Sequence, residues 1–435
     1  MLGDLIGRAT RSSLVREVGM TYSGQIVGSG IGFVVQLLLQ KSLGPAEYGV
    51  LAIAVSVGTF AGVLTDIGVS HAMIRFGSKW LADAPGTPKG MARCSAALFI
   101  RLRLALVVSV VGYLSAGWIL ATFYPHTEGL GTPLRLVFLT LVASTLYGYW
   151  MFFIQTFQRF GLRSLVTVGT AVLRLAAYCT IAALGLVSAS SMIVLDASVT
   201  FVSFLVAMQF SPKGILRPPR EELQSAYKEM LPYLRYTGIL IVADTVFNEL
   251  DVLMLGMLSD EATTGLYRAA WTYAMVLSFL SMSVSNVLFP KITSFSDIDA
   301  MKAFVKKALK LTSLLALATL PSLPFVHWWV PWYEPRYTPA VSIFYIMYVG
   351  TAFDLVIGPL GYTLYSLDRP DVLAKIAIGK VVLHALANWI LIPRYGAHGA
   401  AWASIITRVL GGLVAVAIML HTIRKTQRPT STTAA

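Results

Sequence analysis

The sequence is poor in charged residues, and this scarcity argues against an ordinary soluble architecture. Only 13% of its 435 residues are Asp, Glu, Lys or Arg, whereas 56% are hydrophobic and the mean hydropathy is +0.70. A soluble domain of average composition carries about 25% charged residues. Because so apolar a chain has few polar groups to present to water, we expect lipid to surround most of it.

Cysteines and the motifs of common cofactor sites are also scarce. The only two cysteines, Cys94 and Cys179, are expected at different depths, so no disulfide framework is predicted. The sequence has no P-loop G-x-x-x-x-G-K-[ST] and no zinc-binding H-E-x-x-H. Asp297-Ile-Asp299 has the form of a sugar-transferase D-x-D, but helix capping ahead of a basic segment explains it better. We therefore expect no enzymatic activity, no cofactor and no metal.

The net charge of +13 does not indicate nucleic acid as a partner. Nucleic-acid-binding proteins gather Lys and Arg on a patch or stripe. Here the basic residues lie between long apolar runs, which is the pattern that orients membrane proteins.

Long apolar runs dominate the chain and predict an all-α membrane protein of about twelve transmembrane helices. A run of about eighteen or more apolar residues crosses a hydrocarbon core about 30 Å thick, and backbone inside lipid must satisfy its own hydrogen bonds. None of the runs alternates as a strand would. The runs are 20–40, 48–69, 95–120, 134–154, 164–187, 191–210, 233–256, 266–289, 309–330, 340–362, 371–392 and 398–420.

The distribution of basic residues between alternate loops predicts the orientation. With the N-terminus in the cytoplasm, 22 of the Lys and Arg residues counted in loops fall inside and 3 fall outside. Basic loops are retained on the cytoplasmic side. We therefore expect a multi-pass protein of the cell inner (plasma) membrane with both termini in the cytoplasm.

A polar break at the midpoint predicts two bundles. Residues 216–232 form a cytoplasmic linker between an N-terminal six-helix bundle, 1–215, and a C-terminal six-helix bundle, 233–435. Gly49-Val-Leu-Ala-Ile-Ala54 matches Gly265-Leu-Tyr-Arg-Ala-Ala270, and 157–169 matches 367–379. Because both halves begin on the same side, the repeat is parallel, with a pseudo-twofold axis along the membrane normal, and transporters built this way bind substrate between the halves.

Cations within the predicted spans are candidates for binding an anionic headgroup. Arg174, Lys380 and Arg408 lie near the middle of spans, and His384 lies one turn beyond Lys380 on the same helix face. Each charge costs about 2.5–3.5 kcal/mol to insert at a span centre, so such residues are usually functional. In the structural alternative, they pair with intramembrane acids and hold the bundle together. A role of His384 in proton coupling also stays open.

Acidic residues within or next to the spans are candidates for ion coupling or gating. Asp244 and Asp354 lie near the middle of two spans, and Glu249 lies in the outer half of the span that contains Asp244. Asp66 lies near the cytoplasmic end of the second span. A desolvated carboxylate can bind a coupling H⁺ or Na⁺. The alternative for Asp244 is a counter-ion for Arg174.

Several short motifs, in their order and spacing, resemble the polysaccharide-transporter flippases of the O-antigen type, over nearly the whole chain. The motifs are Gly24-Gln25, Leu43-Gly-Pro-Ala-Glu-Tyr-Gly-Val50, Asp66-Ile-Gly68 with His71-Ala-Met-Ile-Arg75, Gly265-Leu-Tyr267, Asn286-Val-Leu-Phe-Pro290 and Ile392-Pro-Arg-Tyr-Gly-Ala-His-Gly-Ala-Ala401.

This resemblance implies the alternating-access fold of the multidrug, oligosaccharidyl-lipid and polysaccharide exporter superfamily. It implies a flippase that moves a polyprenyl-(pyro)phosphate-linked oligosaccharide from the cytoplasmic to the outer leaflet. The implied partners are that glycan, membrane lipids, an H⁺ or Na⁺ gradient and a glycan polymerase. The cationic cavity of such families fits Arg174, Lys380 and Arg408. Lipid II flippases of this superfamily usually have fourteen spans, so twelve favour the O-antigen type.

Two other functions remain open from the sequence. One is a multidrug or small-molecule antiporter of the same superfamily, whose mostly cationic substrates fit poorly with a positive midplane. The other is a membrane glycan polymerase or ligase. Such enzymes typically present a large outer loop with catalytic residues, whereas the outer loops predicted here have about a dozen residues or fewer.

Overall fold

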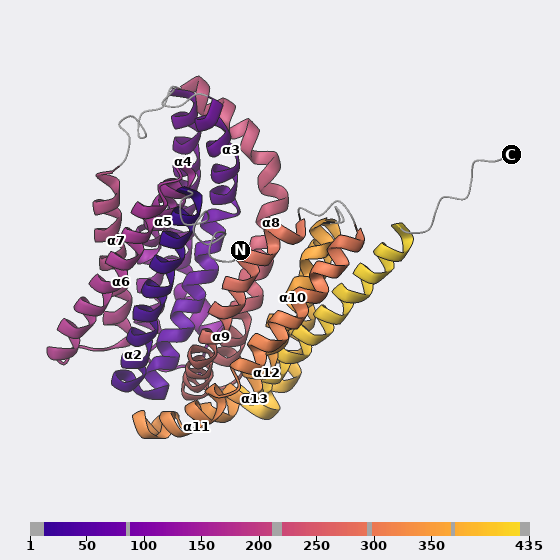
Figure 1. Cartoon of the computed structure of the whole chain (residues 1–435). Coiled ribbons are helices and arrows are strands. Elements are labelled where there is room, and N and C mark those ends of the chain that lie inside the picture. The colour runs from indigo at the N-terminus through magenta and orange to yellow at the C-terminus, as the bar shows by residue number, and fades with distance from the viewer. Residues whose placement is uncertain (1–12, 84–87, 211–219, 294–297, 367–369, 427–435) are drawn as a thin grey trace. The chain divides into compact units, whose positions relative to one another are not determined.

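The computed structural model describes residues 13–83, 88–210, 220–293, 298–366 and 370–426, nearly all of them helical (Figure 1). The chain divides into two compact units, residues 1–245 and 246–435. The first unit contains α2 (Ser13–Asp66), α3 (Val69–Asp83), α4 (Pro88–Phe123), α5 (Gly131–Thr156), α6 (Phe160–Ala183), α7 (Ala189–Met208) and the first part of α8 (Arg220–Leu258).

The second unit is built around α12. It contains the end of α8, α9 (Glu261–Thr293), α10 (Ile298–Ala318), α11 (Ser322–Tyr333), the 3₁₀ turn η1 (Pro335–Tyr337), α12 (Ala340–Ser366) and α13 (Pro370–Thr426). Helices α9, α10 and α13 pack against α12. Figure 1 shows α10, α12 and α13 running beside one another in this unit.

The helices follow the predicted apolar runs closely. Within the described ranges, eight helical segments are long and apolar enough to cross a membrane, and those in α2 and α13 each contain two predicted runs. The runs 233–256 and 266–289 form α8 and α9, which are more polar because α8 carries three acids there and α9 several serines. The run 309–330 is interrupted between α10 and α11, just before Pro321.

The motif Leu43–Val50 forms the turn between the two spans within α2. Gly44 adopts φ 75° and ψ 171°, a conformation that L side chains rarely reach, and Pro45 begins the next span with a preset φ. Glu47 accepts a hydrogen bond of 2.9 Å from the backbone N–H of Ala189, at the start of α7. Tyr48 donates to Gln36 Oε1 over 2.9 Å. The motif therefore reverses the chain and attaches α7 to it.

The second-half motif Ile392–Ala401 makes a comparable turn within α13. Gly396 has φ 54° and ψ −130°. Gly399 lies so close to the preceding span that an added Cβ would collide with the backbone carbonyl of Leu391. The two glycines thus allow the spans of α13 to fold back upon each other without backbone strain.

We expect Gly399→Ala to destabilise the protein by about 1–3 kcal/mol, because a backbone carbonyl cannot move aside as a flexible side chain can. The control is Gly379→Ala on the same helix, where an added Cβ meets no atom within 4 Å. Alanine favours helices, so the control should be neutral or slightly stabilising. Thermal unfolding of both variants in detergent checks this, and equal midpoints would contradict it.

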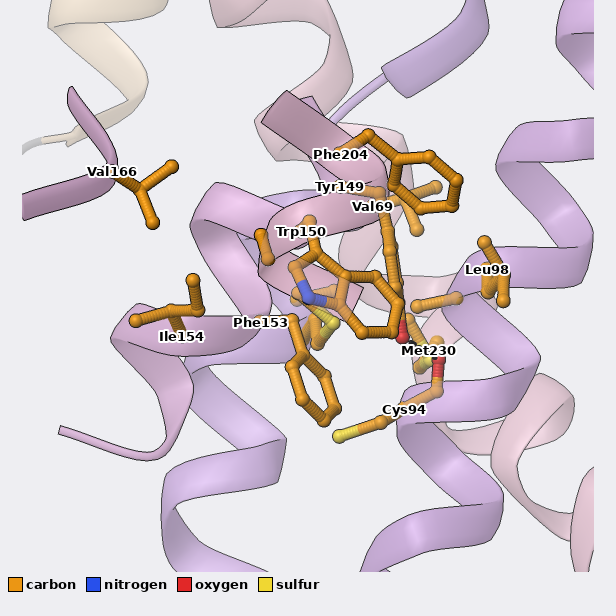
Figure 2. Close-up of a cluster of buried hydrophobic side chains, with 14 residues drawn as sticks. Val69, Cys94, Leu98, Tyr149, Trp150, Phe153, Ile154, Val166, Phe204 and Met230 are labelled. Atoms are coloured by element: carbon orange, nitrogen blue, oxygen red, sulfur yellow. Dashed lines mark hydrogen bonds between the residues drawn. The ribbon is translucent and has the colours of Figure 1, made fainter. Parts of the chain in front are cut away.

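A cluster of buried apolar and aromatic side chains forms the core at one end of the first unit. Trp150 on α5 stacks on Phe153 with ring centroids 5.0 Å apart and meets the edge of Phe204 at 5.7 Å (Figure 2). Tyr149 donates a 2.8 Å hydrogen bond to the carbonyl of Cys94. Met230 on α8 belongs to the same cluster. The core therefore joins five helices to the beginning of α8.

The polar segment 216–232 is helical from Arg220 onward, and its residues 216–219 lie outside the described residues. The boundary between the two compact units falls later than this predicted linker, between residues 245 and 246. The reason is that the first half of α8 packs on the core of the first unit through Met230. Both chain ends, 1–12 and 427–435, also lie outside the described residues.

Candidate functional site

The first unit contains a cavity of about 540 Å³ lined by α2, α4, α5, α6 and α7. Its wall is apolar with hydroxyl and amide groups between the apolar side chains. Its charged lining residues are Arg101, Arg174 and Asp196. A cavity of this size with few polar groups is typical of a ligand site.

Arg174 and Asp196 form an ion pair on the wall of this cavity. Arg174 Nη2 lies 2.5 Å from Asp196 Oδ1, and the two side chains are 33% and 52% exposed. The buried Nε of Arg174 has no hydrogen-bond acceptor within the described part of the chain. The partner of Arg174 is thus Asp196 and not Asp244, which is exposed on α8. A guanidinium with a donor left over can bind a further acceptor.

Asp66 lies at the break between α2 and α3, where Ile67 and Gly68 have positive φ values. Its Oδ1 accepts hydrogen bonds from the backbone N–H and the hydroxyl of Ser70, so Asp66 caps α3. Arg101, only 6% exposed, lies 3.4 Å from the same oxygen and donates to Ser70. Asp66 therefore balances the buried charge of Arg101 beside the cavity.

The second unit gathers three of the predicted site residues around one aromatic ring. Phe247 on α8 lies 4.4 Å from Lys380 Nζ and 5.4 Å from Arg408 Cζ, measured to the ring centroid. The imidazole of His384 lies 4.8 Å from the same centroid. Cations over an aromatic face are attracted by its quadrupole. We call these four side chains the Phe247 cluster.

The predicted acids of the second unit pair with arginines. Asp354 on α12 pairs with Arg408, which also donates from Nε to Ser404 over 3.1 Å. Glu249 lies 3.9 Å from Arg268. Arg408 therefore joins α12 to α13, and several of its five N–H groups are not used by these two contacts.

His384 belongs to a second, fully buried network. Its Nε2 lies 2.7 Å from Asp251 Oδ1, and its Nδ1 lies 3.3 Å from the hydroxyl of Thr407. Asp251 also accepts hydrogen bonds from Asn388, over 2.8 Å, and from the hydroxyl of Tyr267. The carboxylate is thus surrounded by donors from α9 and α13.

Several of these residues are not among those predicted from the sequence. Arg101 and Asp196 lie within predicted spans, so the rule applied to the other intramembrane charges would have found them. Asp251 lies within the predicted run 233–256, so the same rule would have found it as well. Phe247, Tyr267 and Asn388 carry no sequence signal of their own, because a single aromatic or amide in a span is ordinary.

Solved structures with the same fold are known. The chain is similar to the lipid II flippase MurJ in an inward closed conformation, with a TM-score of 0.72, 13% identity, and coverage of 94% of this chain and 87% of that one. It is also similar to an inward-facing multidrug transporter of the MATE family, with a TM-score of 0.66, 14% identity, and coverage of 93% and 99%. The predicted all-helical membrane fold is confirmed.

Two archaeal proteins are similar to the chain by sequence. The chain is 25% identical over 200 residues to the probable flippase AglR of Haloferax volcanii, a match covering 44% of this chain and 42% of AglR. It is 21% identical over 430 residues to an uncharacterized membrane protein of Methanocaldococcus jannaschii, covering 92% and 82%. The family model described as "polysaccharide biosynthesis protein" matches residues 14–296. The chain therefore belongs to the polysaccharide biosynthesis protein family.

Proposed function

We propose that the protein is a flippase that moves a polyprenyl-(pyro)phosphate-linked oligosaccharide from the cytoplasmic to the outer leaflet by alternating access. Membership of the polysaccharide biosynthesis family supports a glycan as cargo. The printed name of AglR and the fold shared with MurJ support lipid-linked cargo. The match to AglR spans about two fifths of that relative, so its activity enters here only as support.

The observation that carries the proposal is the position of three cations on helices that are otherwise apolar. Arg174 lies on the wall of the cavity in the first unit, with its side chain 33% exposed. Lys380 and Arg408 lie over the ring of Phe247 in the second. Charges in lipid are costly, and those retained usually serve binding or transport.

The chemistry of these groups suits a pyrophosphate. An arginine can present two N–H groups to two phosphate oxygens at once, whereas Lys380 supplies a compact charge that adapts to the headgroup. Arg408 holds Asp354 and Ser404 with part of its guanidinium. Its remaining donors, with Lys380, would bind the headgroup while the polyprenyl chain stays in lipid.

The orientation and the location belong to the same proposal. The excess of basic residues in alternate loops supports an inner (plasma) membrane protein with both termini in the cytoplasm. A transmembrane H⁺ or Na⁺ gradient would drive the cycle, and a glycan polymerase would receive the cargo outside.

Depletion of the protein in its host is the decisive test of cargo. We expect lipid-linked glycan to accumulate where only inside-out membrane vesicles expose it to an added lectin. Restoring the chain should return the glycan to the outer leaflet. An unchanged leaflet distribution, together with increased sensitivity of the cells to a lipophilic cation such as ethidium, would instead identify a drug exporter.

A further inference from the structure

Hydroxyl groups recur along the wall of the cavity in the first unit. Six of its lining residues are Ser or Thr, and they come from α2, α5 and α7: Thr59, Thr65, Thr140, Ser144, Thr145 and Thr200. Apolar side chains such as Val55 and Val137 lie between them. An apolar wall with a few polar groups binds organic ligands, and the polar groups fix the orientation of the ligand. The kind of ligand then depends on whether these groups donate or accept hydrogen bonds.

The protons of these six hydroxyl groups are already used within the protein. Thr145 lies 3.2 Å from Thr65 Oγ1, whose own proton is engaged, so Thr145 donates to Thr65. A hydroxyl group has one proton and two acceptor lone pairs. All six are therefore left with acceptor oxygens and no proton for a ligand. The five that donate to a backbone carbonyl of their own helix, over 2.7–3.1 Å, are Thr59, Thr65, Thr140, Ser144 and Thr200.

Asp196 on α7 adds a carboxylate to the same wall. Its Oδ1 pairs with Arg174 at 2.5 Å, and its side chain is 52% exposed. A carboxylate can only accept hydrogen bonds, and Oδ2 is left for a further donor. Three of the hydroxyl groups are exposed or half-buried and can also meet a ligand. We call these three and the carboxylate the acceptor wall, which consists of Thr59, Thr140, Ser144 and Asp196.

The cations that line the cavity are each matched by an acid. Arg174 is paired with Asp196, and the buried Arg101 lies 3.4 Å from Asp66. The cavity therefore offers many acceptors and no excess of positive charge from these residues. A phosphate group presents acceptor oxygens and negative charge, so it would leave the acceptor wall unpaired. An acceptor that loses water and gains no donor weakens binding.

A sugar ring matches this wall better than a phosphate does. Each sugar hydroxyl group can donate a proton to an acceptor and can also accept from a guanidinium such as that of Arg174. The C–H faces of the ring can pack on the apolar side chains that separate the hydroxyl groups, such as Val55 and Val137. The volume of about 540 Å³ lies within the range of pockets that hold small organic ligands. It therefore suits a short saccharide.

We propose that the cavity of the first unit is a subsite for sugar rings of the cargo, in which the acceptor wall receives hydrogen bonds from sugar hydroxyl groups. This rests on the proposed function, in which the cargo is a lipid-linked oligosaccharide. Arg174 then balances and positions Asp196. The anionic headgroup is left to Lys380 and Arg408 of the second unit, which lie over the ring of Phe247.

The subsite is tested by equilibrium dialysis of the purified full-length protein in detergent against two probes. One is the oligosaccharide that mild acid releases from the lipid-linked glycan of the host, and the other is inorganic pyrophosphate. Thr140→Val combined with Ser144→Ala removes two acceptors of the wall. We expect this variant to bind the oligosaccharide about 10-fold or more weakly than the wild type, because two hydrogen bonds are lost. Its affinity for pyrophosphate should be unchanged.

The matched control is Thr180→Val combined with Ser198→Ala. These two exposed hydroxyl groups of α6 and α7 also donate to their own helices, over 3.0 and 2.7 Å, but they do not line the cavity. The control should bind both probes like the wild type, and thermal midpoints should agree among the three proteins. Ser144→Ala alone repeats the test at an exposed position where the core is not disturbed. It should weaken oligosaccharide binding by a smaller factor.

The possible outcomes separate the subsite from the proposed function. Equal affinity of the wild type and the Thr140→Val, Ser144→Ala variant for the oligosaccharide would overturn the subsite, as would weaker pyrophosphate binding by that variant alone. Absence of oligosaccharide binding to the wild type, in a host where depletion traps lipid-linked glycan inside, would overturn the subsite and leave the flippase standing. Binding that depends on the acceptor wall, with an unchanged leaflet distribution on depletion, would support the subsite and overturn the flippase.

Discussion

Arg408→Ala is expected to reduce export of lipid-linked glycan by about 100-fold or more. The loss of two charge-assisted hydrogen bonds to a phosphate, at about 1.5–3 kcal/mol each, corresponds to a change of this size or larger. Arg408→Lys should retain part of the activity because it keeps the charge without the planar fork. Lectin labelling of intact cells measures export, and immunoblotting of membranes measures protein level. Arg135→Ala, which removes an exposed arginine of α5, is the matched control.

The ion pair with Asp354 makes the same experiment a test of a purely structural role. Alanine at 408 leaves Asp354, 35% exposed, without its arginine, which is expected to lower the protein level somewhat. Adding Asp354→Asn should restore the level but not export. If the double variant exports normally, Arg408 only balances Asp354 and the headgroup role is lost. Arg174→Ala with and without Asp196→Asn gives the equivalent comparison in the first unit.

Trp150→Ala should have the largest effect on stability, about 3–5 kcal/mol, because it removes a buried indole from the centre of the first unit's core. Trp150 is 2% exposed and contacts the rings of Phe153 and Phe204. We expect a large drop in the thermal midpoint in detergent, or failure to accumulate in the membrane.

The matched control for this core substitution is Trp118→Ala. Trp118 is 63% exposed on α4 and meets the edge of the Phe123 ring at 5.6 Å, so most of its indole lies outside the packed core. Its loss should change the midpoint by far less. Equal losses in the two variants would mean that Trp150 contributes no more than any membrane-facing tryptophan.

Hydropathy predicted the helices well because the length of an apolar run is itself the physical requirement for crossing lipid. It did not predict that the segment after residue 220 packs on the core of the first unit, because this segment is polar. The prolines and charges of this segment predict that it lies at the surface. The side chain of Met230, however, packs in the core of the first unit. Local composition does not reveal such a long-range contact.

The candidate site was predicted as a set of residues but not as a set of pairs. Sequence position gives the depth of Arg174 in the membrane, and several acids lie at similar depths. Which acid it meets depends on how α6 and α7 are rotated toward each other, and the answer is Asp196. The same holds for Asp251, whose partners Tyr267 and Asn388 come from two other helices.

The buried network around Asp251 also has a consequence for biosynthesis. Asn388 lies 137 residues after Asp251, so α8 leaves the ribosome well before α13 can supply Asn388 and His384. In that interval the carboxylate has to be hydrated, protonated or shielded by the insertion machinery, because an unpaired charge in lipid is unfavourable. Maturation of the second unit is thus completed only when α13 arrives, and quality-control proteases would recognise chains in which it does not.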